Sequence, residues 1–147
     1  MGDTNSFEFS GFLSQESSDT VPTIKAQVPE LFTIAHDLNT LVMRMAADAA
    51  EAAQVSSMEP AAIAVRVLMR ACGIYQSVLL LASKGNVADA RSLVRSIVED
   101  AFVIASICQD PDRFMKLFKE DAYGSRKWQT NFVIENGWAE GEALGFV

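Results

Sequence analysis

The chain has 147 residues, half of them apolar, and a net charge of −7 at pH 7. This length fits one domain with a sizeable core. The acidic balance argues against general affinity for nucleic acid or for anionic membranes, because both attract clustered Lys and Arg. Cys72 and Cys108 have no CxxC neighbour and are expected to be buried, reduced thiols. Because the N-terminus also has no signal-peptide pattern, we expect a cytoplasmic protein.

Residues 1–27 are predicted to be a disordered or loosely docked, flexible N-terminal tail. Ser, Asp, Thr and Gln dominate this segment, and so polar a stretch cannot bury enough surface to order itself alone. Its few large apolar residues form a cluster that is expected to dock either on the bundle or on a partner. The cluster consists of Phe7, Phe9, Phe12 and Leu13.

A first long helix is predicted over residues 29–54. Pro29 suits the first helical position, and apolar residues from Leu31 to Ala52 recur at intervals of three and four. This spacing predicts one apolar stripe along the helix.

A second helix is predicted to run to about Lys84, with Pro60 in its first turn. It is apolar on most sides, which predicts either the central helix of a bundle or part of an oligomer interface. It is long enough to span a bilayer, but Arg66, Arg70 and Gln76 interrupt it. Because charge at mid-helix is costly in lipid, we expect a core helix and no membrane association.

The turn Gly85-Asn86 separates this helix from a third, predicted over residues 87–109. Asp110 and Pro111 then start a fourth helix, with a kink or break expected at Tyr123-Gly124. Residues 137–147 are predicted to be a C-terminal tail or a truncated element. Short connections between long helices predict an all-α, antiparallel bundle of four or five helices over residues 28–136.

The sequence has few of the residues that catalysis usually requires. His36 is its one histidine, and no Glu-x-x-His pair, paired CxxC, GxSxG elbow or phosphate-binding glycine loop is present. We therefore predict no catalytic residue, no metal site and no cofactor. An enzyme remains an alternative that needs four carboxylates to converge: Asp48, Glu51, Glu99 and Asp100.

One polar constellation lies on the third helix, where Arg91, Arg95 and Glu99 are four residues apart. Folding the second helix back on the third brings Glu99 near Arg70, and Arg95 level with Gln76. Such a cluster either fixes the helix register or bridges two subunits, or it is an anion-binding pocket in which an arginine pair holds a carboxylate or phosphate. The predicted ligand-binding residues are Arg70, Tyr75, Gln76, Arg91, Arg95 and Glu99.

Residues 90–99 read A-R-S-L-V-R-S-I-V-E, after a tyrosine-bearing helix and before the Asp110-Pro111 break. Over roughly residues 60–125 the chain resembles a family of uncharacterised bacterial helical proteins with an A-R-x-L-x-R-x-x-x-E helix. The resemblance implies a helical fold and brings no activity with it. A distant resemblance to HEPN-type nuclease bundles lacks their Arg-x(4–6)-His motif, because His36 precedes every arginine.

Three functions follow as hypotheses. The first is a non-enzymatic helical interaction or oligomerisation module that forms a homodimer or other homo-oligomer and docks other proteins. The second is a bundle that binds or senses a small anionic ligand through Arg91 and Arg95. The third is a divergent nuclease or a metal-dependent nucleotide hydrolase. Nucleic acid is not an expected partner of the module.

Overall fold

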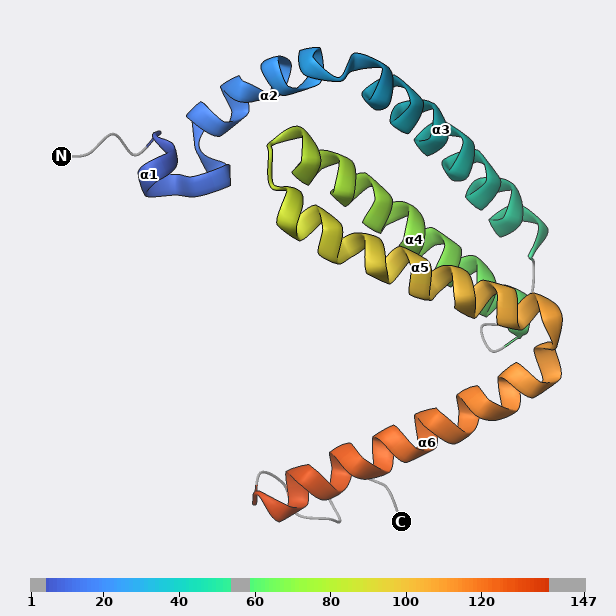
Figure 1. Ribbon diagram of the computed structural model, residues 1–147. Helices are drawn as coiled ribbons and strands as arrows, with labels where there is room; N and C mark the ends of the chain where they lie inside the picture. The colour runs from blue at the N-terminus through green and yellow to red at the C-terminus, as the bar shows by residue number, and fades with distance from the viewer. Residues whose placement is uncertain (1–4, 54–58, 138–147) are drawn as a thin grey trace. The chain divides into compact units, whose positions relative to one another are not determined.

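The computed structural model describes residues 5–53 and 59–137, and within these ranges the chain is helical and has no strand. The all-α fold predicted from the sequence is therefore confirmed. Figure 1 shows the elements in chain order. They are α1 (Phe7–Ser10), the 3-10 turn η1 (Gly11–Leu13), α2 (Gln15–Gln27), α3 (Pro29–Ala52), α4 (Pro60–Ser83), α5 (Val87–Gln109) and α6 (Pro111–Glu135). The chain forms two units, Met1–Ala105 and Ser106–Val147.

The helix boundaries lie where the local sequence signals place them. Proline occupies the first turn of α3, α4 and α6. Asp110 caps α6, because its carboxylate accepts the Arg113 backbone N–H at 3.0 Å. Gly85 adopts φ +80° after α4, a conformation that other residues rarely reach. The break expected at Tyr123-Gly124 is absent, since α6 continues through it. One glycine costs a helix only about 1 kcal/mol.

Residues 7–27 contain short helices where the sequence alone predicted a tail. The Ser14 hydroxyl caps α2 by accepting the Ser17 backbone N–H at 3.0 Å. The Lys84 ammonium, beyond the end of α4, donates to the Phe12 carbonyl at 3.0 Å and to the Ser18 hydroxyl at 3.4 Å. The serine cap and the contacts from Lys84 therefore stabilise helices in a segment whose polar composition did not predict them.

In the first unit, helix α4 contacts both of the other long helices, α3 and α5. Its Tyr75 hydroxyl donates to the Ala35 carbonyl of α3 at 3.0 Å, and its Cys72 thiol lies 3.7 Å from the Val42 carbonyl. On α5, Asp100 pairs with Arg70. Among the described residues of this unit, the buried apolar side chains are few and mostly small: Ala46, Ile63, Cys72 and Ala90.

The apolar stripe predicted for α3 consists of two stripes, offset by one residue. The inner stripe packs toward α4 and consists of Phe32, Ala35, Asn39, Val42 and Ala46. The outer stripe is exposed along its whole length and consists of Leu31, Ile34, Leu38, Leu41 and Met45. The first unit therefore leaves large apolar side chains in contact with solvent, with Ile34 65% exposed.

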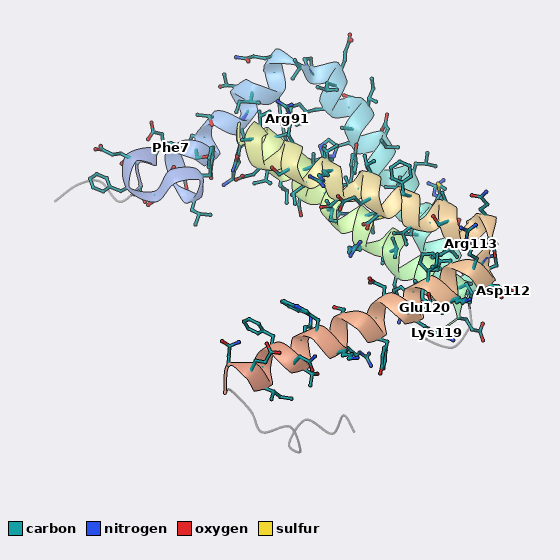
Figure 2. The ribbon with its side chains drawn as sticks, turned by 60° about the horizontal axis from the view of Figure 1, so that its bottom comes forward. Phe7, Arg91, Asp112, Arg113, Lys119 and Glu120 are labelled. Atoms are coloured by element: carbon teal, nitrogen blue, oxygen red, sulfur yellow. The ribbon has the colours of Figure 1, made fainter. Side chains whose placement is uncertain are left out.

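The second unit contains the end of α5 and all of α6. Within residues 106–137, Ile107 is the buried apolar residue. Along α6 the rings of Phe114 and Phe118 stack at 5.8 Å between centroids, one turn apart. Charged residues line the first half of the same helix, as Figure 2 shows for Asp112, Arg113, Lys119 and Glu120. Cys108 is exposed, so the expectation that both thiols are buried is wrong for this one.

Candidate interaction groove

An apolar groove opens between α3, α4 and α5. It encloses about 420 Å³, a volume within the range of protein binding pockets. We call this cavity the groove. Its lining residues are Leu38 and Val42 on α3, Leu68, Ala71, Cys72, Tyr75 and Val78 on α4, and Val94, Ile97, Ala101 and Ile104 on α5.

The two polar atoms on the groove floor are already engaged. The Tyr75 hydroxyl donates to Ala35 and the Cys72 thiol to Val42, both toward the α3 backbone. Burial raises the pKa of the Cys72 thiol and of the Tyr75 phenol, so both groups stay protonated at neutral pH. The groove therefore offers carbon surface to an occupant, and no nucleophile or proton-transfer group.

Exposed apolar stripes border the groove on both sides. On α3 this is the outer stripe defined above. On α5 four exposed apolar residues and one arginine follow one another at intervals of four and three: Val87, Arg91, Val94, Val98 and Phe102. We call them the α5 stripe. Such spacing is typical of the seam along which two helices pack. Both stripes continue the groove wall, because Leu38 and Val94 belong to a stripe and to the groove.

The predicted polar cluster is not assembled as the sequence suggested. Arg70 pairs with Asp100, not with Glu99: its Nε donates to Asp100 Oδ2 at 3.1 Å and its Nη2 donates to Oδ1. This hydrogen bond and the charge of Asp100 raise the pKa of Arg70, and the charge of Glu99 adds a smaller effect. Glu99 is therefore near Arg70, while its neighbour in the sequence makes the contact.

The remaining predicted site residues lie in separate places. Arg95 Nε donates to Glu99 Oε1 at 2.9 Å, along the exposed side of α5. Arg91 is exposed near the start of α5 (Figure 2) and has no ion-pair partner in the part of the chain that the structure describes. Tyr75 reaches α3, and Gln76 lines another hollow. The groove contains Tyr75 and the other hollow contains Gln76, so these two residues line different cavities.

The hollow at Gln76 holds about 270 Å³ between α2, α3 and α4, and it also contains Lys25, His36 and Asn39. The sequence did not single it out. Asn39 Oδ1 is buried there and has no hydrogen-bond partner among the described residues. Asn39 interrupts the otherwise apolar inner stripe of α3. A single asparagine at such a position favours one helix register over others.

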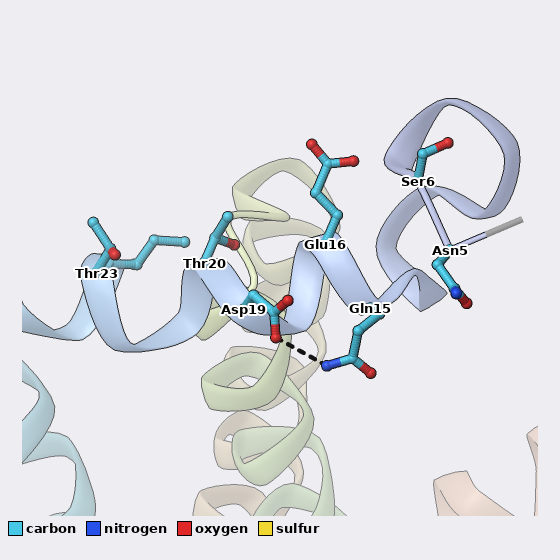
Figure 3. Close-up of a pocket in the computed structure, with 8 residues that line it drawn as sticks. Asn5, Ser6, Gln15, Glu16, Asp19, Thr20 and Thr23 are labelled. Carbon is cyan, nitrogen blue, oxygen red and sulfur yellow. Dashed lines mark hydrogen bonds between the residues drawn. The ribbon is translucent and has the colours of Figure 1, made fainter. Parts of the chain in front are cut away.

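The hollow near the N-terminus is open. It holds about 590 Å³ and is lined by Glu16, Asp19, uncharged polar side chains and Ile24 (Figure 3). Gln15 Nε2 donates to Asp19 Oδ1 at 2.9 Å. Two carboxylates and no cation line this hollow, so it does not suit an anionic ligand.

The carboxylates that an enzyme would need do not form a metal site in residues 5–53 and 59–137. Nowhere in these ranges do three or more His, Cys, Asp or Glu side chains come together. Asp100 is engaged with Arg70 instead. The geometry of the described residues therefore supplies no support for the metal-dependent alternative.

In the described part of the chain, one helix is long and apolar enough to cross a membrane by length and composition: α4. Core helices of soluble proteins satisfy the same criterion. Only a small part of its most apolar stretch is buried. This exposure requires an explanation, because a core helix is normally covered on most sides.

Comparisons with known proteins give one match. The model of a family of unknown function, DUF5677, matches residues 61–140, more than half of the chain. The match spans α4, α5 and α6 and leaves α3 outside. No curated protein matches the chain, and no solved structure does.

Proposed function

The chain belongs to DUF5677, a family of unknown function, and we propose that it acts as a helical interaction module that self-associates through the groove. The observation that carries this proposal is the pair of exposed apolar stripes that border the groove on α3 and α5. Helices of a bundle normally bury such stripes against one another.

Exposing these stripes to water is unfavourable. Removing apolar surface from water contributes about 25 cal/mol per Å², which is about 1.5–3 kcal/mol for a fully buried Leu or Ile. Contiguous apolar patches larger than a few hundred Å² are rare on monomers and mark interaction sites when they occur. A partner that covers Leu31, Ile34, Leu41 and Val98 together therefore gains much of its binding energy from this term.

A protein partner fits this surface better than a bilayer does. Helix α4 carries Arg70 near its middle and Arg66 one turn earlier, and Arg70 is paired with a carboxylate on α5. Charged groups at the centre of a membrane helix are costly. The exposed surface of α4 is then the floor of an interface, and the protein stays in solution.

A second copy of the chain suits the groove because it brings the same apolar stripes. Homo-oligomers with closed two-fold symmetry are the commonest assemblies of soluble proteins. The groove walls carry branched and aliphatic side chains at helix-packing intervals, and another helical pair can interdigitate with them.

Native mass spectrometry combined with light scattering tests the proposal. The chain mass is 16.0 kDa, and we expect a dimer at twice this value. Leu38→Glu places a charge in the groove wall and is expected to give a folded monomer. Ala47→Glu places the same charge on an exposed position of α3 outside both stripes and is expected to leave the dimer intact.

Circular dichroism of both variants establishes that they are folded. A wild-type protein that stays monomeric at about 100 μM would contradict the proposal, because a groove of this kind should bind at least that tightly. Equal dissociation by both variants would contradict the assignment of the interface to the groove.

A further inference from the structure

We propose that the two copies are related by a two-fold axis parallel to the helices, so that α3 of each copy lies along α5 of the other. In this arrangement Asp37 of one copy lies between Arg91 and Arg95 of the second. The inference rests on the proposed function and adds to it the orientation of the partner and the residues that select it.

The directions of the helices support this arrangement. Residue numbers rise on α4 from Cys72 to Tyr75 as their partners fall on α3 from Val42 to Ala35, so these helices are antiparallel. Helices α4 and α5 form a hairpin about Gly85 (Figure 1). Both α3 and α5 are thus antiparallel to α4, and they run parallel to each other along the two sides of the groove.

The contacts to α4 also fix which residues of α3 and α5 are level. Val42 lies at Cys72, and the pairing of Arg70 with Asp100 places Cys72 level with Val98. Val42 and Val98 are therefore level, as are Leu38 and Val94. Asp37, which precedes Leu38, is therefore level with Leu93, which lies between Arg91 and Arg95 on α5.

A two-fold axis parallel to the helices preserves these levels between copies. Leu38 and Leu41 of one copy then meet Val94 and Val98 of the other, and the same contact forms twice. The four helices that meet, α3 and α5 from each copy, close a core that neither copy closes alone.

The charges beside the two stripes are complementary in this arrangement. Glu30 and Asp37 lie seven residues apart, on the solvent side of the outer stripe of α3, and neither has an ion-pair partner within the described ranges. Arg91 lies in the α5 stripe and Arg95 beside it. The exposed pair of Arg95 with Glu99 contributes only a few tenths of a kcal/mol. Arg95 can therefore exchange Glu99 for Asp37 at little cost.

The other closed two-fold arrangement lacks this complementarity. An axis perpendicular to the helices would place α3 on α3 and α5 on α5. With this axis at the level of Leu93, Asp37 would meet Asp37 of the second copy, and Arg91 would meet Arg95. Like charges at an interface disfavour that arrangement and select the parallel one.

A charge exchange tests the contact between Asp37 and Arg95. Asp37→Arg and Arg95→Asp, each alone, are expected to raise the dimer dissociation constant at least tenfold in sedimentation equilibrium. The double variant is expected to return to within about threefold of the wild type. Glu120→Arg on α6 makes the same change in net charge as Asp37→Arg and should leave the constant unchanged.

Disulfide trapping tests the orientation. In a Cys108→Ser background, chains with Leu38→Cys are mixed with chains carrying Val94→Cys and are then oxidised. A disulfide-linked dimer is expected only in the mixture. A cross-link in Leu38→Cys alone would show α3 facing α3 and would overturn the inference.

The two proposals fail separately. If Leu38→Glu dissociates the dimer and the charge exchange restores nothing, the orientation is wrong while the groove remains the interface. If Leu38→Glu leaves the oligomeric state of the wild type unchanged, the proposed function itself fails, and the orientation fails with it.

Discussion

The carboxylate of Asp100 is fully buried, whereas the Arg70 side chain that donates to it is 63% exposed. The two halves of this ion pair therefore lose different amounts of solvation when the chain folds. Asp100 depends on Arg70 for its charge partner, while Arg70 keeps its access to water. The stability of the fold is therefore expected to depend on which member of the pair is replaced.

Replacing Arg70 is expected to destabilise the fold more than replacing Asp100. Arg70→Met leaves the Asp100 carboxylate buried and unpaired, at a cost of about 2–4 kcal/mol in the free energy of unfolding. Asp100→Asn keeps one acceptor for the guanidinium and leaves no buried charge, at a cost of about 1 kcal/mol. Urea denaturation at one fixed protein concentration measures both values. A larger loss for Asp100→Asn would contradict the burial of this carboxylate.

The two thiols are expected to react at different rates. Cys108 is exposed, while burial raises the pKa of Cys72 above the ordinary thiol value. Since the thiolate is the reactive form, iodoacetamide should label Cys108 first and Cys72 only after unfolding. Between pH 7 and pH 9 the rate at Cys72 should stay slow, because burial raises the pKa of this thiol. Mass spectrometry of a time course separates the two sites, and equal rates would contradict the prediction.

The folded protein is expected to lose stability in alkaline solution. The pKa values of Cys72 and Tyr75 are both raised by burial. Their contribution is complete below the ordinary thiol pKa of about 8.5 and the phenol pKa of about 10, and it is lost as the pH rises through the raised values. Urea midpoints should therefore fall between pH 8 and pH 11.

Tyr75→Phe tests the phenol's share of that loss. The variant should reduce the alkaline decline, because its ring has no proton to lose. It also removes the hydrogen bond to the Ala35 carbonyl, at a cost of about 1 kcal/mol at neutral pH. A variant that declines as steeply as the wild type would show that Tyr75 does not titrate with unfolding.

Lys84 is expected to hold residues 7–27 against the end of α4. Lys84→Met removes the contacts to the Phe12 carbonyl and the Ser18 hydroxyl. Amide exchange in α2 should then accelerate, while exchange in α4 and α5 stays within about twofold of the wild type, since the lost contacts are local. Protection of α2 that persists in this variant would mean that contacts other than those of Lys84 hold the segment.

The sequence predicts the four long helices well because their signals are local. Spacing of apolar residues marks α3, α4 and α5, while Asp110 and Pro111 mark the start of α6. Helix α2 escaped prediction because its side chains are polar, and a serine cap and contacts from α4 hold it. Composition does not record such contacts.

The site was less predictable for a geometric reason. Glu99 and Asp100 are one residue apart, which is about 100° around a helix, and a helical wheel cannot decide which of them turns toward Arg70. For α3, the periodicity marks both stripes as apolar and does not say which one α4 covers. That choice depends on packing between helices far apart in the sequence.

The turn at Gly85 has a further consequence, for the order in which the chain folds. Only three residues, Lys84 to Asn86, separate α4 from α5, so little loop entropy is lost when the two helices pair. The α4–α5 hairpin is therefore expected to form early and to offer a ready surface on which α3 condenses. Any side chain at φ +80° is strained, so Gly85→Val should slow refolding as well as lower stability. The rate at which the chain folds is thus expected to depend on one glycine.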